Sequence, residues 1–175
     1  PPKTADGVAF LTIGNVTTGE LDFTDCRFVS QEYYDGLKNY RRPVRGDLLY
    51  TVVGATYGRP AVVETDRAFC VQRHIAILKP TSECDAAFLK ALLKSPLIYE
   101  QATSGTTGTA QPTIPLGPLR EFVVPLPPKA EQRRIVAKVS ALLSQLDELS
   151  SRLRSRQLTT DAYLTALIHQ ILGTQ

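Results

Sequence analysis

The sequence predicts an α+β fold. A mixed β-sheet domain with short helices is expected over residues 1–124, followed over residues 125–175 by a long coiled-coil-forming α-helix and a second C-terminal helix. Before Pro125, short runs rich in β-branched and aromatic residues alternate with glycine-containing turns, which is typical of strands. After Pro128, apolar residues recur in steps of four and three, the heptad spacing of a coiled coil.

Length and composition limit the class of protein. The chain has 175 residues, of which 43% are hydrophobic, enough for one core and an appendage but too few for two ordinary domains. No apolar run is long enough for a membrane span and no secretory signal begins the chain, so we expect a cytoplasmic protein. Cys26, Cys70 and Cys84 lie far apart without a CxxC pair, which favours buried free thiols over a disulfide or a zinc site.

Charge alone does not indicate a nucleic-acid ligand. Residues 1–128 contain 13 Lys and Arg and 13 Asp and Glu, so their formal net charge is zero. Residues 129–175 contain 7 and 4, and this difference supplies the whole net charge of +3. If the chain binds DNA, its cations must cluster locally, or a partner must contribute much of the attraction to phosphates.

Five runs early in the chain have the composition of strands, and the third and fourth form a hairpin. Gly54 and Gly58 permit the tight reversal between these two runs. Ser30 is a suitable N-cap for a short helix over residues 31–40, which Pro43 prevents from continuing. The five expected strands are residues 8–16, 21–29, 47–53, 61–64 and 68–78.

The segment after these strands predicts two short helices and one more strand. A capping box that begins at Ser82 precedes an apolar stripe over residues 87–94, and Pro96 prevents this first helix from continuing. We expect the second short helix over residues 97–102. The final strand is expected over residues 120–124, where it leads into the proline run.

The proline run suits a helix start, because proline lacks an N–H that the first turn leaves unpaired, and Glu131 then lies at the positive end of the helix dipole. The heptad seam fails at Arg156, after which a second amphipathic helix is expected to end at Gly173. Neither apolar stripe can be buried by its own helix, so each needs this chain's domain, a second copy or another protein. The residues of the first seam are Ile135, Val139, Leu142, Leu146, Leu149 and Leu153.

Several segments together resemble one protein family. The turn at residues 125–136 reads PLPP-x-x-EQ-x-x-I-V and is the most specific of them. Further similar segments are residues 8–16, 46–49, 54–63, 105–110 and 114–119. On these residues the chain resembles the specificity subunit of type I restriction–modification systems, in which a target recognition domain runs into a long helix. The resemblance covers nearly the whole chain.

The resemblance implies a function for both parts. Residues 1–124 would be a target recognition domain for double-stranded DNA, and residues 125–175 a conserved helical region for spacing and dimerisation. The expected partners are a DNA methyltransferase subunit, a restriction subunit reached through it, and a second copy or the other half of a two-domain subunit. Together they would act at a bipartite site. The chain itself is expected to be non-catalytic, without cofactor or metal, because it lacks an Asn/Asp-Pro-Pro-aromatic motif, a metal cluster and a nucleophile elbow.

The densest basic and aromatic cluster in the first 128 residues lies at the end of the expected first helix. Arginine can donate to guanine O6 and N7 or to phosphate, and tyrosine hydroxyls reach phosphates, so this chemistry suits a DNA-binding surface. A solvated helix end with cations near its C-terminus explains the same residues equally well. The candidates here are Lys38, Tyr40, Arg41, Arg42 and Arg45.

The hairpin and the strand after it provide further DNA-binding candidates. The hairpin tip carries Tyr57 and Arg59, and an arginine on such a tip can probe a groove. The other interpretation is that the turn needs only its glycines. Arg73 and His74 interrupt the last apolar strand, where a family member would place them toward DNA. A lone histidine is more often a hydrogen-bonded structural residue.

The polar loop at residues 103–113 is the last candidate segment. It is glycine-spaced and rich in hydroxyl groups, so its side chains and N–H groups could contact phosphates. Thr106, Thr107 and Gln111 are the candidates, and the amide of Gln111 can pair with adenine. A flexible connection between two elements is the alternative, although loops held on a rigid frame often carry binding residues.

Two other functions fit the sequence. In one, the chain is a helical assembly module whose globular part does not read DNA. In the other, it is the recognition domain of a fused restriction–methylation enzyme. A DNA reader is expected to select a sequence from random duplexes, whereas an assembly module is expected to lose association when its seam is made polar at Leu146.

Overall fold

The computed structural model describes residues 2–108 and 111–173. It divides into two compact units, Pro1–Arg133 and Arg134–Gln175, and each is described by itself. The division falls after the first turn of the long helix and not at residue 124. The reason is that Gln132, in that first turn, is fully buried in the first unit.

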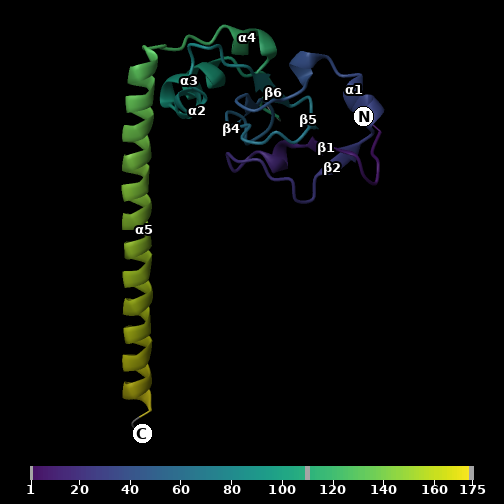
Figure 1. Ribbon diagram of the computed structural model, residues 1–175. Coiled ribbons are helices and arrows are strands. Elements are labelled where there is room, and N and C mark those ends of the chain that lie inside the picture. The colour runs from purple at the N-terminus through teal and green to yellow at the C-terminus, as the bar shows by residue number, and fades with distance from the viewer. Residues whose placement is uncertain (1, 109–110, 174–175) are drawn as a thin grey trace. The chain divides into compact units, whose positions relative to one another are not determined.

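Sheet A has three strands and is mixed (Figure 1). Its central strand β1 (Val8–Leu11) pairs antiparallel with β2 (Arg27–Val29) and parallel with β5 (Phe69–Val71). In this register Ala9 lies opposite Phe28 on one side and Phe69 on the other. Sheet A therefore brings the first strand of the chain beside a strand from the middle of the first unit.

Sheet B has three strands and is antiparallel. Its central strand β3 (Leu48–Thr51) pairs with β4 (Pro60–Val62) on one side and with β6 (Ile75–Leu78) on the other. The pairing of β3 with β4 confirms the predicted hairpin. Gly54 and Gly58 lie between these strands with φ of +86° and +83°, which a residue with a side chain rarely adopts.

The prediction of one strand over residues 68–78 is wrong. The chain turns after β5, where the Ile75 N–H donates to the Gln72 carbonyl (3.0 Å), and then enters the other sheet as β6. Arg73 and His74 occupy this turn, and so they do not interrupt a strand. The alternation of apolar residues was real, but it belonged to two strands in two sheets.

Among the described residues of the first unit, four short helices and two 3-10 turns accompany the sheets. Ser30 caps the first of these helices as predicted, because its hydroxyl accepts from the Tyr33 N–H (3.2 Å). This helix ends at Asp35, before Gly36, so the prediction of a helix to residue 40 is wrong. The elements are α1 (Gln31–Asp35), α2 (Ala86–Leu93), α3 (Pro96–Ser104), α4 (Leu116–Arg120), η1 (Ile13–Asn15) and η2 (Asn39–Arg41).

Helices α2 and α3 confirm the two short helices expected after the strands. The capping box at Ser82 is wrong, since Asp85 caps α2 instead: its Oδ1 accepts from the N–H groups of Ala87 and Phe88 at 2.9 and 3.1 Å. The strands expected at residues 8–16 and 21–29 are also shorter than predicted. They contribute only β1 and β2, because η1 follows β1 and irregular chain precedes β2.

The final strand predicted over residues 120–124 is wrong. Helix α4 ends at Arg120, and residues 122–128 belong to no helix or strand. Here the side chain of Gln101 makes the main-chain hydrogen bonds that a neighbouring strand would make. The Gln101 amide accepts from the Val123 N–H (2.8 Å) and donates to the Val123 carbonyl (3.1 Å).

Apolar side chains form layers on both faces of each sheet, because successive residues of a strand point to opposite faces. Leu49 of β3 packs with Ala9 and Leu11 between the two sheets. Its neighbours Leu48 and Tyr50 point the other way and pack against α2, α3 and α4. The outer face of sheet A is covered by α1. Strands buried on both faces explain why the sequence showed apolar runs with weak alternation.

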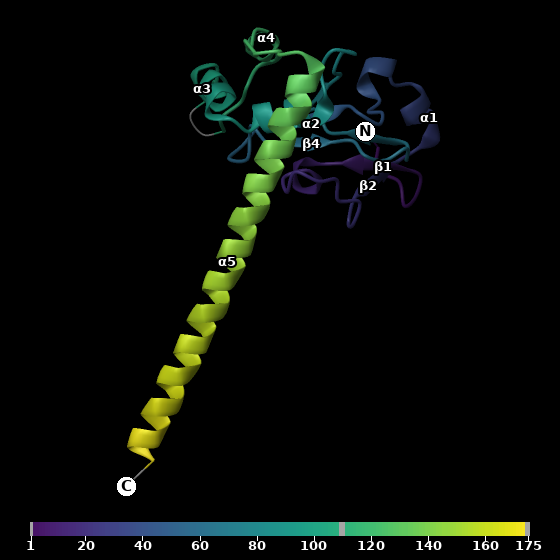
Figure 2. The ribbon, with the colours of Figure 1, turned by 60° about the vertical axis from the view of Figure 1, so that its left-hand side comes forward.

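Helix α5 (Lys129–Leu172) is 44 residues long and continuous (Figure 2). The Pro128 carbonyl accepts from the N–H groups of Glu131 and Gln132, which confirms the helix start at the proline run. Its end before Gly173 is also confirmed. A Cβ at Gly173 would lie 2.8 Å from the His169 carbonyl oxygen, so glycine suits this end sterically.

The prediction of a second C-terminal helix is wrong, because α5 continues through Arg156. No glycine or proline interrupts residues 129–172. The hydroxyls of Thr159 and Thr160 donate to carbonyls one turn earlier (3.0 Å each), so these side chains do not compete with the helix for its hydrogen bonds. A change in the apolar pattern was therefore mistaken for a break in the backbone.

Three general properties follow from the described residues. Cys70 is buried and its burial raises the thiol pKa to about 11, whereas the free thiols of Cys26 and Cys84 are half-buried. Within residues 2–108 and 111–173, no group of His, Cys, Asp and Glu side chains is placed to hold a metal ion. Nor does that part of the chain contain a helix long and apolar enough to cross a membrane.

Candidate nucleic-acid interface

Three loops meet where β3 ends, and main-chain hydrogen bonds hold them together. The Val52 N–H donates to the His74 carbonyl (3.0 Å), and the Ile114 N–H donates to the Val52 carbonyl (2.8 Å). The Gly54 N–H donates to the Pro112 carbonyl (2.9 Å). We call this region the loop end of sheet B, and it comprises residues 54–59, 72–74, 105–108 and 111–113.

The hairpin turn supplies Tyr57, which is one ring of an aromatic pair, and the cation of Arg59 to the loop end. The ring of Tyr57 stacks on the ring of Tyr99 from α3, with centroids 6.0 Å apart and planes 5° from parallel. The Tyr57 hydroxyl is 3.1 Å from the Thr103 Oγ1. Arg59 is exposed and donates to the Thr17 carbonyl (3.1 Å). The tyrosine is thus held in place, while the guanidinium keeps other donors for a ligand.

The turn between β5 and β6 presents Arg73. Its Nε donates to the Nε2 of His74 (3.2 Å), whose Nδ1 lies 3.2 Å from the side-chain amide of Gln72. Arg73 is exposed and His74 is half-buried. His74 therefore contacts both of its polar neighbours in this turn, Arg73 and Gln72.

The polar loop is a small hairpin of its own. Thr107 and Thr113 exchange both main-chain hydrogen bonds (2.9 Å each), and the Thr106 hydroxyl donates to the Thr103 carbonyl (2.7 Å). The side chains of Thr107 and Gln111 are exposed. Thr109 and Ala110, which belong to the segment similar to the family, lie outside the described residues. The loop is thus held on a frame, and it presents a hydroxyl and an amide to solvent.

A groove of about 610 Å³ runs beside β6 and continues the basic surface of the loop end. Tyr40 and Arg41 from η2, Arg73 and Arg120 border it, together with Lys79. No carboxylate is among its described lining residues. We call it the β6 groove. It brings two residues of the first basic cluster close to Arg73.

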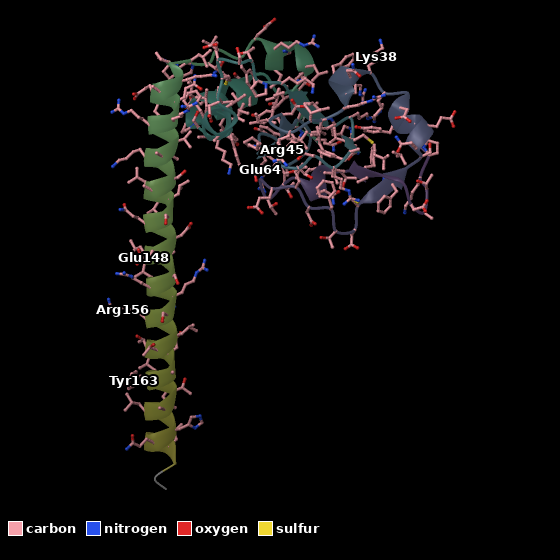
Figure 3. The ribbon with its side chains drawn as sticks, viewed as in Figure 1. Lys38, Arg45, Glu64, Glu148, Arg156 and Tyr163 are labelled. Carbon is pink, nitrogen blue, oxygen red and sulfur yellow. The ribbon has the colours of Figure 1, made fainter. Side chains whose placement is uncertain are left out.

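Three candidates of the first cluster lie apart from this surface. Arg42 is half-buried: its guanidinium covers the Tyr34 ring at 5.1 Å and donates to the Asp35 carbonyl, so it secures α1. Arg45 precedes β3, at the opposite end from the loop end. Figure 3 shows Lys38 apart from Arg45. None of these three cations lines the β6 groove with Arg73.

Arg45 forms a two-pronged ion pair with an acidic side chain. Its Nε and one terminal nitrogen lie 2.8 and 2.7 Å from the two carboxylate oxygens of Asp66. This hydrogen-bonded pair raises the pKa of Arg45 and lowers the pKa of Asp66. Arg45 therefore has a carboxylate partner already, whereas the described contact of Arg73 is to a histidine.

Sequence reasoning missed three residues of this region. Tyr99 was assigned only to a short helix, but the residue is 55% exposed and its ring stacks on Tyr57. Arg120 was assigned to a strand, and it lies in the last turn of α4 beside the groove. Tyr50 is fully buried beneath the hairpin turn, and its hydroxyl has no partner in the described residues. Burial raises the pKa of Tyr50 to about 12.

The seam of α5 is exposed over most of its length. Ile135 and Val139 are half-buried, whereas the four seam leucines, Leu142, Leu146, Leu149 and Leu153, are 47–58% exposed. Because α5 continues through Arg156, the later apolar stripe can be placed relative to the first. Leu164 follows Leu153 by eleven residues, which is only about 20° more than three full turns, so both lie on one side.

Figure 3 labels polar residues along the same helix. Glu148 and Arg152 form an ion pair one turn apart (2.6 Å), and both side chains are largely exposed. Arg156 and Tyr163 occupy the positions where the heptad steps would have continued. The apolar side of α5 is thus interrupted for about two turns and then resumes.

Comparisons with known proteins place these features in a family. Residues 4–157 match the model of the type I restriction modification DNA specificity domain. The chain belongs to this family. It is 30% identical over 152 residues to the Type I restriction enzyme EcoBI specificity subunit of Escherichia coli.

Two solved structures are similar to this specificity domain. One, described as "Structural basis underlying complex assembly and conformational transition of the type I R-M system", has a TM-score of 0.67 and 25% identity over 99% of this chain. The HsdS subunit from Thermoanaerobacter tengcongensis has a TM-score of 0.65 over 85% of the chain at 24% identity, which supports the fold alone. Both confirm the α+β class.

The specificity domain spans about a third of the EcoBI subunit. The matched region is 86% of this chain but 31% of that relative. The two solved chains are covered to 40% and 38%. The activities and partners of such longer proteins are therefore only proposed for this chain.

The proline-to-EQ turn of this specificity domain has a physical explanation. The Gln132 Oε1 accepts from the Asp85 N–H (2.8 Å), while its Nε2 donates to the carbonyls of Glu83 and Pro127 (2.8 and 2.7 Å). One buried amide thus joins the start of α5 to the cap of α2. The sequence motif marked this residue, but only the structure reveals its partners.

Proposed function

We propose that this chain is a DNA-reading part of a type I restriction–modification specificity subunit. The observation that supports this most directly is the meeting of three loops at the end of a rigid sheet, with Arg59, Arg73 and Gln111 exposed. Arginine donates two hydrogen bonds to guanine, and a glutamine amide pairs with adenine. Loops on a rigid frame suit this task, because they can differ in sequence without loss of the fold.

Phosphate contacts are assigned to the side chains around these readers. Tyr57 and Thr107 offer hydroxyls for such contacts at the loop end. Contacts of this kind fix the register of a protein on the duplex without reading its sequence. The first 128 residues have a formal net charge of zero, so we expect modest affinity for DNA that a partner increases.

The proposed role of α5 is assembly. Its exposed leucines would pack against an equivalent helix, from a second copy or from the other half of a longer subunit. Two DNA-reading domains at a fixed separation would then read a bipartite site. A DNA methyltransferase subunit would hold the helices and a restriction subunit would join through it. The chain itself would supply no catalytic group and would act in the cytoplasm.

Selection from randomised DNA duplexes tests this proposal. The purified chain is mixed with duplexes at moderate salt, and the retained DNA is sequenced. Enrichment of a short motif is the expected result, and two copies at a fixed spacing would also report a dimer. Retention without enrichment, both alone and with a methyltransferase subunit, would contradict direct base readout.

A matched set of arginines makes the selection specific to the loop end. Arg73→Ala is expected to abolish the enrichment of at least one base position. Arg45→Ala removes the same charge at the opposite end of β3, so it should leave the enriched motif unchanged. Equal effects of both changes would mean that general positive charge accounts for the binding.

The alternative of a helical assembly module has one observation in its favour, the exposed seam of α5. It predicts partner binding without any selected DNA sequence. The same selection therefore separates the two functions, because enrichment of a motif is expected only of a DNA reader.

A further inference from the structure

The β6 groove has a free sheet edge on one side. Sheet B has the order β4-β3-β6, so β6 is an outer strand, and no strand of the described residues pairs with its outer edge. The Val52 N–H bonds to the His74 carbonyl, which makes these two residues a hydrogen-bonded pair. Alternation along an antiparallel ladder then points the main-chain groups of Ile77 and Lys79 away from β3. Both residues line the groove.

The opposite side of the groove is a segment with strand composition but without a strand partner in the described part of the chain. Phe122 and Val124 line the groove, and Val123 between them is 76% exposed. The main chain of Val123 is paired on one side by the Gln101 amide. The groove therefore lies between an open strand edge and a segment whose residues favour a sheet.

The floor of the groove is apolar and its border is cationic. Ile75, Ile77, Leu89, Leu116 and Leu119 are among the apolar lining residues. Lys79 is already paired, since its Nζ lies 2.5 Å from the buried carboxylate of Asp47. Arg41, Arg73 and Arg120 remain around the floor, and the described lining contains no carboxylate. The groove thus favours a ligand with both apolar groups and negative charge.

We propose that the β6 groove binds an extended acidic segment of a partner protein by strand addition. The segment would pair its main chain with Ile77 and Lys79, as peptides do on open sheet edges. Its alternate side chains would enter the apolar floor, and its Asp or Glu side chains would meet Arg41 and Arg120. DNA fits less well, because its phosphates and base edges leave the floor of leucine and isoleucine without a complement.

Peptide binding in solution tests this inference. The probe is a fluorescein-labelled hexapeptide in which valine and glutamate alternate, and fluorescence anisotropy reports its binding to the full chain. Binding is expected for this peptide and not for a valine–lysine peptide of the same pattern. Equal binding of both peptides, or of neither, would overturn the proposal.

Matched variants assign the binding to the groove. Arg120→Glu is expected to weaken binding at least about tenfold, the loss of one charge-assisted hydrogen bond. Arg27→Glu makes the same change at an exposed position on β2 and should leave the affinity unaltered. If both variants weaken binding equally, the peptide is held by overall charge and the proposal fails.

Amide hydrogen exchange distinguishes strand addition from a looser contact. The Ile77 and Lys79 amides are expected to exchange more slowly when the valine–glutamate peptide is present, whereas amides of β2 should not change. Peptide binding without this protection would overturn the strand geometry. Binding of a random-sequence duplex that needs Arg120, with no binding of the peptide, would assign the groove to DNA and overturn the proposal as well.

Discussion

The two units of this chain bury their apolar side chains in opposite ways. In the first unit, both faces of both sheets are covered, and residues such as Leu49 and Ile98 are fully buried. In the second unit, the described residues from Ser140 onward have no such cover, because there is one helix and nothing packed along it. The first unit contains its own hydrophobic core, whereas the described part of the second unit presents an exposed apolar side.

This difference indicates which property of each unit a substitution of its exposed residues would affect. The first unit exposes polar loops on a buried frame, so changes in those loops can alter a ligand without loss of the fold. The second unit exposes apolar positions, and a partner that covered them would stabilise the helix. Substitutions in the two units should therefore affect different measurements.

The largest effect is expected from a charge in the seam of α5. Leu146→Asp would bury an unpaired carboxylate in any helix pair, at a cost of about 3 kcal/mol or more, equal to more than about 100-fold in association. Sedimentation equilibrium with the chain alone and with the proposed methyltransferase partner measures this loss. Ser144→Asp places the same charge on the opposite side of the helix and should have little effect. Unaltered association of the Leu146 variant would mean that the seam is not an interface.

A smaller effect, confined to the first unit, is expected from the start of α5. Gln132→Ala removes a fully buried side-chain amide and leaves three main-chain groups without this partner, at Asp85, Glu83 and Pro127. We expect the free energy of unfolding to fall by about 3 kcal/mol in urea titrations. Gln145→Ala on the exposed part of α5 is the matched control. A loss below about 0.5 kcal/mol would show that the amide does not join α5 to the first unit.

The fold class and several elements could be predicted from the sequence because their signals are local. Glycines marked the hairpin, Ser30 marked a helix start, and the proline run marked the start of α5. The break after β5 was missed although Gln72, Arg73 and His74 are polar, because this turn contains no glycine or proline to mark it. The continuity of α5 was missed for a related reason: the apolar pattern changed at Arg156, while the backbone met no glycine or proline.

Part of the candidate site could be predicted, again from local sequence signals. Tyr57 and Arg73 were chosen for their chemistry, and the structure brings their loops together through hydrogen bonds that no sequence pattern reports. Arg42 and Arg45 had the same chemistry, but each is engaged elsewhere, with Tyr34 and with Asp66. Arg120 was missed because its place depends on α4, which replaced an expected strand.

An intermediate effect on function, without an effect on stability, is expected at the loop end. Arg73→Ala should weaken binding to the selected duplex about tenfold or more, the usual value of one good base contact. Its unfolding midpoint in urea should stay unchanged, since the side chain is exposed. Arg45→Ala is the control of equal charge. If Arg73→Ala lowers affinity for all duplexes equally, its contact is to phosphate and base choice lies elsewhere in the three loops.

The smallest effect concerns a buried group beneath those loops. Tyr50→Phe removes a buried hydroxyl that has no partner in the described residues, so the free energy of unfolding near pH 7 should rise or stay within about 1 kcal/mol.

The pH dependence of the free energy of unfolding is a sharper test of the same residue. The pKa of Tyr50 is raised to about 12 in the folded chain from 10.0, so between these values the unfolded state has lost a proton that the folded state keeps. Stability should therefore fall with rising pH across that range, and by less in the Phe variant. Urea midpoints at about pH 8 and 11 measure the difference, with Tyr163→Phe on exposed α5 as the control. Identical pH profiles for Tyr50→Phe and the unchanged chain would mean that this phenol is hydrated in solution. The hydrophobic core of the first unit would then be open to water at Tyr50, and its contrast with the exposed α5 would be smaller.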